Sequence, residues 1–88
     1  MTLNQKLFAI YNAYPRHICR GRALPAIEQA LRKVGKEFPE EDPYKFLLGK
    51  VKEFAASDLG QSSMCPYCEN WMAGEQWADD TKEWNYAD

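Results

Sequence analysis

Eighty-eight residues, of which 45% are hydrophobic and twelve are Trp, Tyr or Phe, suffice for one small domain with an apolar core. No apolar run approaches the ~18 residues of a transmembrane helix, and residues 1–14 lack the apolar stretch and cleavage site of a signal peptide. We therefore expect a cytoplasmic protein with no membrane partner, in which the three cysteines stay reduced.

The net charge is only −2, but the basic and acidic residues are unevenly distributed along the chain. Residues 1–36 hold seven basic residues and one acid, whereas residues 37–88 hold four basic residues and twelve acids. Either the two halves attract each other across the fold, or the basic half binds a nucleic acid or an acidic protein partner. The candidate binding residues are Arg16, Arg20, Arg22, Arg32, Lys33 and Lys36.

A first helix is predicted from about Thr2 to Ala13. Thr2 and Gln5 fit a capping box, and an apolar stripe that includes Tyr14 recurs at helical spacing. Pro15 then ends the helix, because the residue before a proline is pushed out of the α region. Residues 16–22 are expected to form a basic connector.

Two more main helices follow in the predicted order. The second is expected from about Ala23 to Lys36, with Pro25 in its first turn, where the missing N–H costs nothing. The third begins with Asp42 as N-cap and Pro43 as first helical residue, and runs to about Asp58. Gly60 is expected as its C-cap glycine.

A short fourth helix is predicted over residues 66–73, with Gly74 after its end and Trp71 and Met72 pointing inward. No segment shows the alternating pattern of a half-buried strand. The expected fold class is therefore all-α: three main helices and a short Trp-bearing fourth form one domain over residues 1–80. Residues 81–88 are expected as a loosely ordered acidic tail.

The tetrapeptide Cys65-Pro66-Tyr67-Cys68 has the letters of a glutaredoxin active site. Such chemistry needs a low-pKa thiolate at a helix N-terminus within a βαβ context. Here the motif follows three helical segments and leaves only twenty residues, so a thiol oxidoreductase is the least favoured hypothesis. We expect no catalytic residues, no small-molecule substrate and no enzymatic activity, because no constellation positions an acid, base or nucleophile.

A structural zinc site is the second alternative. His17, Cys19, Cys65 and Cys68 supply four ligands of the types that tetrahedral zinc prefers. The Cys-x-x-Cys half has ordinary spacing, whereas the His-x-Cys half is tighter than usual. If no metal is bound, the thiols are expected to serve as small buried hydrophobic groups, and the domain then needs no cofactor.

Two stretches together resemble a known family. The first is Tyr14-Pro15-Arg16 followed by an alanine-rich helix over residues 23–31; the second is Pro66-x4-Trp71 followed by Trp77-x-Asp-Asp. In order and spacing they resemble a small helical domain at the C-terminus of many bacteriophage and prophage replication-type DNA-binding proteins. The resemblance covers roughly residues 7–80.

This resemblance implies a phage-like helical unit associated with replication or DNA handling, without catalysis. It also implies that Trp71 and Trp77, with Tyr14, belong to the structural core. Tyr67, Cys68 and Gln76 depart from the family pattern, which has His, Pro and a basic residue there. The leading hypothesis is therefore a non-enzymatic nucleic-acid-associated or replication-complex interaction module.

Overall fold

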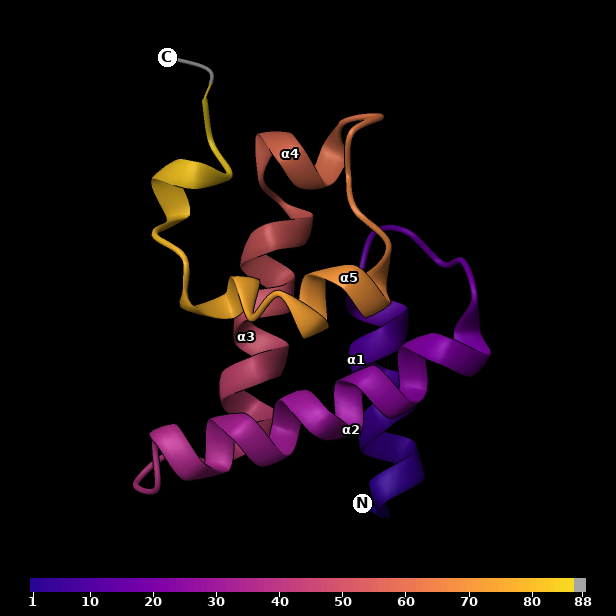
Figure 1. Cartoon of the computed structure of the whole chain (residues 1–88), viewed down its shortest axis with the longest axis vertical. Helices are drawn as coiled ribbons and strands as arrows, with labels where there is room; N and C mark the ends of the chain where they lie inside the picture. The colour runs from indigo at the N-terminus through magenta and orange to yellow at the C-terminus, as the bar shows by residue number, and fades with distance from the viewer. Residues whose placement is uncertain (87–88) are drawn as a thin grey trace.

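The computed structural model describes residues 1–86, and Figure 1 shows that its regular elements are all helices. No strand occurs within this described range, so the predicted all-α class is confirmed. In chain order the elements are α1 (Leu3–Ala13), α2 (Arg20–Glu37), α3 (Pro43–Ala55), α4 (Asp58–Gln61), α5 (Cys68–Ala73) and the 3₁₀ turns η1 (Gln76–Ala78) and η2 (Thr81–Glu83).

Local signals set most helix ends. The Thr2 hydroxyl accepts from the Gln5 amide at 3.2 Å and the Gln5 side chain accepts from the Thr2 amide at 2.8 Å, which confirms the capping box. Asp42 caps α3 by accepting from the amides of Tyr44 and Lys45. Gly74 follows the last residue of α5, as predicted.

Helix α2 begins at Arg20, three residues earlier than expected, so the basic connector is shorter than predicted. Cys19 precedes it in the left-handed conformation, with φ of 57°. Pro25 therefore lies inside the helix, beyond its first turn. Because Pro25 and Gly21 are both exposed, solvent can reach the Gly21 carbonyl that the proline leaves without its helical N–H partner.

Helix α3 ends at Ala55, about three residues before the predicted end, and Ser57 begins a new helix by accepting the Gly60 amide at 3.0 Å. The prediction that Gly60 is a C-cap was therefore wrong. Gly60 lies inside α4, is buried, and has no positive φ. Because Gly60 has no side chain, its backbone lies close to the backbone at the end of α3.

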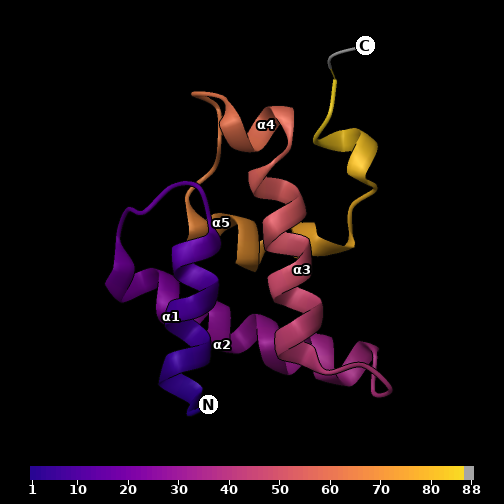
Figure 2. The ribbon, with the colours of Figure 1, turned by 180° about the vertical axis from the view of Figure 1, so that it is seen from behind.

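Figures 1 and 2 show the arrangement from opposite sides: α1 and α3 run side by side, and α2 crosses both on one face. The short α5 packs mainly on α2, and α4 sits beyond the C-terminal end of α3. This arrangement leaves one face of α2 on the outside of the molecule along its whole length.

The core is centred on Trp71, which is fully buried at the middle of α5. Its ring centroid lies 5.2 Å from that of Phe54 and 5.9 Å from that of Tyr14. Trp77 and Trp84 pack against it at 6.4 and 6.0 Å. The structure thus buries Tyr14, Trp71 and Trp77, the three residues expected in the core.

The prediction of a loosely ordered tail from residue 81 was wrong for the described residues 81–86. Trp84 is only 1% exposed, and its carbonyl accepts the Leu59 amide at 2.9 Å. The Asn85 side chain accepts the Asp58 amide at 3.1 Å. A large apolar ring therefore ties this acidic segment to α4 and to the core; residues 87 and 88 of the predicted tail lie outside the described residues.

Candidate nucleic-acid interface

Four of the six predicted binding residues share the exposed face of α2. At 100° per residue they fall within an arc of about 100°, and they extend over about 21 Å of the helix. The opposite face carries Ala23, Ile27, Ala30 and Val34, which are buried. We call this set the α2 basic stripe: Arg22, Arg32, Lys33 and Lys36.

Acidic side chains accompany the stripe. Arg22 pairs with Glu69 at 3.9 Å and Lys33 pairs with Glu75 at 3.6 Å, so both ion pairs join the basic and acidic halves of the chain. Arg32 pairs with Glu28 of its own helix at 3.6 Å. The attraction between the halves is therefore real, but such exposed pairs contribute only ~0–1 kcal/mol each. They leave the basic groups accessible: the Arg22 side chain is 75% exposed.

Arg16 and Arg20 do not belong to this face. The Arg16 Nη1 donates to the Cys65 carbonyl at 2.8 Å, and its guanidinium lies 4.6 Å from the centre of the Tyr67 ring. Arg20 lies on the opposite side of α2, where its guanidinium carbon is 5.7 Å from the centre of the Phe8 ring. The six predicted residues thus lie in three separate places, because helical geometry and tertiary contacts divide residues that are close in sequence.

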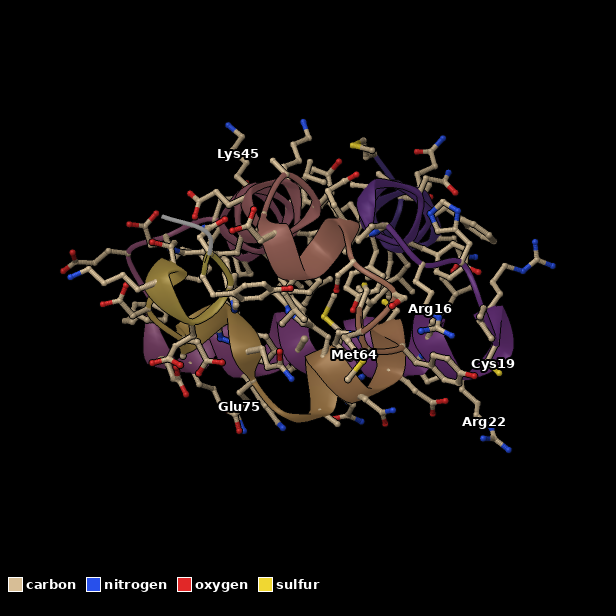
Figure 3. All side chains as sticks on the ribbon, turned by 90° about the horizontal axis from the view of Figure 1, so that it is seen from above. Arg16, Cys19, Arg22, Lys45, Met64 and Glu75 are labelled. Carbon is tan, nitrogen blue, oxygen red and sulfur yellow. The ribbon has the colours of Figure 1, made fainter. Side chains whose placement is uncertain are left out.

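The predicted four-ligand zinc set is not assembled. Cys65 and Cys68 are buried beside the core, whereas Cys19 is exposed and stands at the outer edge of the molecule in Figure 3. His17 Nε2 lies 3.2 Å from the Asn12 carbonyl, and its ring packs 5.0 Å from that of Tyr11. Within residues 1–86, no three His, Cys, Asp or Glu side chains are grouped so that they could hold a metal ion.

The two motif cysteines are packed as small hydrophobic groups. The Cys65 thiol donates to the Tyr14 hydroxyl at 3.9 Å, and that hydroxyl donates to the Pro66 carbonyl at 2.6 Å. Burial raises the pKa of Cys65, and burial followed by the neighbouring Cys65 raises the pKa of Cys68 to about 12. Thiol–disulfide chemistry needs a thiolate, and this environment disfavours it.

Alkaline pH should therefore weaken the fold. The folded state holds the Cys68 proton more tightly than the unfolded chain, whose thiol pKa is 9.0. The resulting stabilisation is complete below about pH 9 and is lost as the pH rises towards about 12. Burial also raises the pKa of Tyr14 above its ordinary value of 10.0. Above about pH 10, the buried Tyr14 hydroxyl therefore adds to the loss of stability.

Urea unfolding at several pH values between about 8 and 11 would measure this loss. We expect the free energy of unfolding to fall less steeply with pH in Cys68→Ala than in the parent protein, because that variant lacks the buried thiol. Cys19→Ala is the matched control, since Cys19 is exposed, and it should keep the parent slope. Equal slopes in all three proteins would contradict the prediction.

A cavity of about 460 Å³ was not anticipated from the sequence. It lies between the α1–α2 connection and the α4–α5 connection. The contributing positions are more than forty residues apart, so no local pattern could have indicated them. The lining residues are Pro15, Arg16, Gly60, Gln61, Ser62, Ser63 and Cys65.

No protein-family model, curated protein or solved structure matches this chain. Among residues 1–86, no helix combines the length and the apolar character needed to cross a membrane.

Proposed function

We propose that this helical domain is a non-enzymatic nucleic-acid-associated module of phage-like origin, acting in a replication complex in the cytoplasm. The α2 basic stripe would contact the phosphate backbone. The observation that carries the proposal is the alignment of Arg22, Arg32, Lys33 and Lys36 on one exposed helix face, opposite the buried face.

The length of the stripe matches several phosphates of a nucleic-acid strand. Its length of about 21 Å corresponds to roughly six phosphate steps along one strand, at about 3.4 Å each. Lysine and arginine contacts of this kind position a protein on nucleic acid without reading bases. The stripe also carries no aromatic residue on which bases could stack, so we expect binding without sequence preference.

The acidic neighbours of the stripe limit the expected affinity. Each of Glu28, Glu69 and Glu75 forms an ion pair with a basic side chain of the stripe, and a phosphate would have to replace it. Lys36 takes part in no ion pair among residues 1–86, so it can reach a phosphate without losing one. Binding should therefore be weak and should decrease as salt screens the charges.

Charge reversal on the stripe tests the proposal. We expect Arg32→Glu with Lys36→Glu to lower the affinity for a short duplex about tenfold or more, and to reduce the salt slope by about 2. Fluorescence anisotropy over a salt series, with duplex and single-stranded DNA, measures both quantities. Binding that did not weaken with added salt would contradict a phosphate contact.

Lys45→Glu with Lys52→Glu is the matched control. These exposed α3 lysines give the same change in net charge, and Figure 3 shows Lys45 on the side of the molecule opposite Arg22 and Glu75. At about 0.15 M salt the screening length is about 8 Å, so the control should bind nearly as the parent does. An equal loss in both double variants would show that only net charge matters.

Neutralising the acidic partner of Lys33 separates the two interpretations of the charge asymmetry. If the stripe binds phosphates, Glu75→Gln should strengthen DNA binding, because Lys33 loses its competing carboxylate. If the charges serve only to hold the two halves together, the same variant should lose stability and gain no affinity. Thermal melting and anisotropy on one sample distinguish these outcomes.

A further inference from the structure

The cavity beside Arg16 has an unusual charge balance. Of its seven lining residues only Arg16 is charged, and no carboxylate is among them. Among the other polar lining residues, the Gln61 side chain donates to the Ala55 carbonyl and the Ser62 hydroxyl donates to the Leu59 carbonyl, whereas the Ser63 hydroxyl donates to no residue in the range 1–86. The cavity is therefore a polar recess with one fixed positive group.

Arg16 is held in place by neutral partners. Its Nη1 donates to the Cys65 carbonyl at 2.8 Å, and its guanidinium is stacked on the Tyr67 ring. A carbonyl and an aromatic ring orient the group without cancelling its charge, and no ion pair among residues 1–86 includes Arg16. A guanidinium has five N–H donors, so most of them remain for a ligand.

The opposite wall of the cavity is also fixed. The Ser62 hydroxyl donates to the Leu59 carbonyl at 2.8 Å and accepts the Met64 amide at 3.1 Å, and so shapes the turn after α4. The Ser63 hydroxyl makes no hydrogen bond with residues 1–86 and is exposed. Figure 3 shows Arg16 close to the body of the molecule, to one side of Met64, whereas Arg22 extends outward at the edge.

We propose that this cavity binds a phosphate group, with Arg16 and Ser63 donating to its oxygens. A guanidinium fork beside a hydroxyl donor suits a tetrahedral oxyanion, and the lack of a lining carboxylate removes the usual competitor. The site goes beyond the proposed function, because none of its residues belongs to the α2 basic stripe. The phosphate could be carried by a small molecule or could end a nucleic-acid strand.

Proton–nitrogen NMR titration with inorganic phosphate, at constant ionic strength, tests the site. We expect saturable shifts of the amides of Arg16 and of residues 61–65. Ser63→Glu should abolish them, because it adds a carboxylate to the lining that Arg16 shares, and Arg16→Lys should weaken binding about tenfold. Ser63 is exposed, so its variant should keep the parent's dispersed spectrum.

Lys45→Gln is the matched control: it removes one positive charge at an exposed α3 position outside the cavity and should leave phosphate binding unchanged. Shifts that do not saturate, or that persist in Ser63→Glu, would overturn the site. Arg32→Glu with Lys36→Glu should also leave it intact, so this site and the α2 basic stripe can fail independently.

A competition experiment identifies the source of the phosphate. Competition by a 5′-phosphorylated oligonucleotide, but not by the same oligonucleotide with a 5′-hydroxyl, would assign the phosphate to a strand end. Competition by neither oligonucleotide would assign it to a small molecule.

Discussion

Replacing Trp71 by alanine is expected to abolish cooperative folding. Trp71 is fully buried, and its ring contacts those of Tyr14, Phe54, Trp77 and Trp84, which come from four different segments. Large-to-small changes of this kind cost about 3–5 kcal/mol, whereas a chain of this length has only ~4–13 kcal/mol in total. Near-ultraviolet circular dichroism during heating measures the effect, and a native transition in Trp71→Ala would show that this central role is wrong.

Trp71→Phe is the matched control. The Trp71 indole N–H has no hydrogen-bond acceptor within residues 1–86, so phenylalanine removes volume without breaking a hydrogen bond. We therefore expect this variant to keep a cooperative transition at a lower temperature. If it unfolded as completely as Trp71→Ala, the contribution of Trp71 could not be explained by the filling of the core.

Replacing Gly60 by alanine is expected to be the most damaging single methyl addition. A Cβ at this position would overlap the Phe54 carbonyl oxygen and would lie 2.9 Å from the Phe54 carbonyl carbon and 3.2 Å from the Ala55 Cα. All three are backbone atoms, which cannot rotate away as a flexible side chain can. We expect a loss of about 3 kcal/mol or more in the free energy of unfolding.

The displacement should be local to α4. Moving α4 away from the end of α3 would break the Ser57 hydrogen bond to the Phe54 carbonyl and the backbone bond between Leu59 and Trp84. Faster hydrogen exchange at the Leu59 amide would report this change, and urea unfolding would give the free energy. Parent-like exchange and stability in Gly60→Ala would contradict the close approach.

Gly49→Ala is the opposite case on the neighbouring helix. Gly49 lies inside α3, is exposed, and has nothing within 4 Å of where a Cβ would stand. Alanine should therefore stabilise the protein by about 0.5–1 kcal/mol, through helix propensity alone. Opposite signs for the two glycines would show that the space around each Cβ, and not the residue type, decides the outcome.

Short-range patterns in the sequence were enough to predict the helices. Thr2 with Gln5, and Asp42 with Pro43, act within one turn of chain, so the beginnings of α1 and α3 were predicted correctly. Helical periodicity also indicated the buried faces, because a stripe of apolar residues must be removed from water wherever the helix packs. The all-α class follows from these local terms.

Interactions between distant segments decided the rest. Trp84 joins the core through contacts with α3, α4 and α5, which no pattern near residue 81 indicates. Gly60 looks like a C-cap in sequence, yet packing of α4 against α3 makes it a close-contact position. Cys65 and Cys68 of the redox-like motif are buried because α5 packs with Trp71 at the centre of the molecule.

The same distinction between local and long-range interactions applies to the two candidate sites. The sequence by itself determined which residues carry positive charge, and helical geometry then placed Arg22, Arg32, Lys33 and Lys36 on one face. Only the tertiary structure separated Arg16 from this set and placed it in the lining of the same cavity as Ser63, forty-seven positions later in the chain. A helix face depends on spacing within one segment, whereas a cavity depends on how segments distant in sequence pack together.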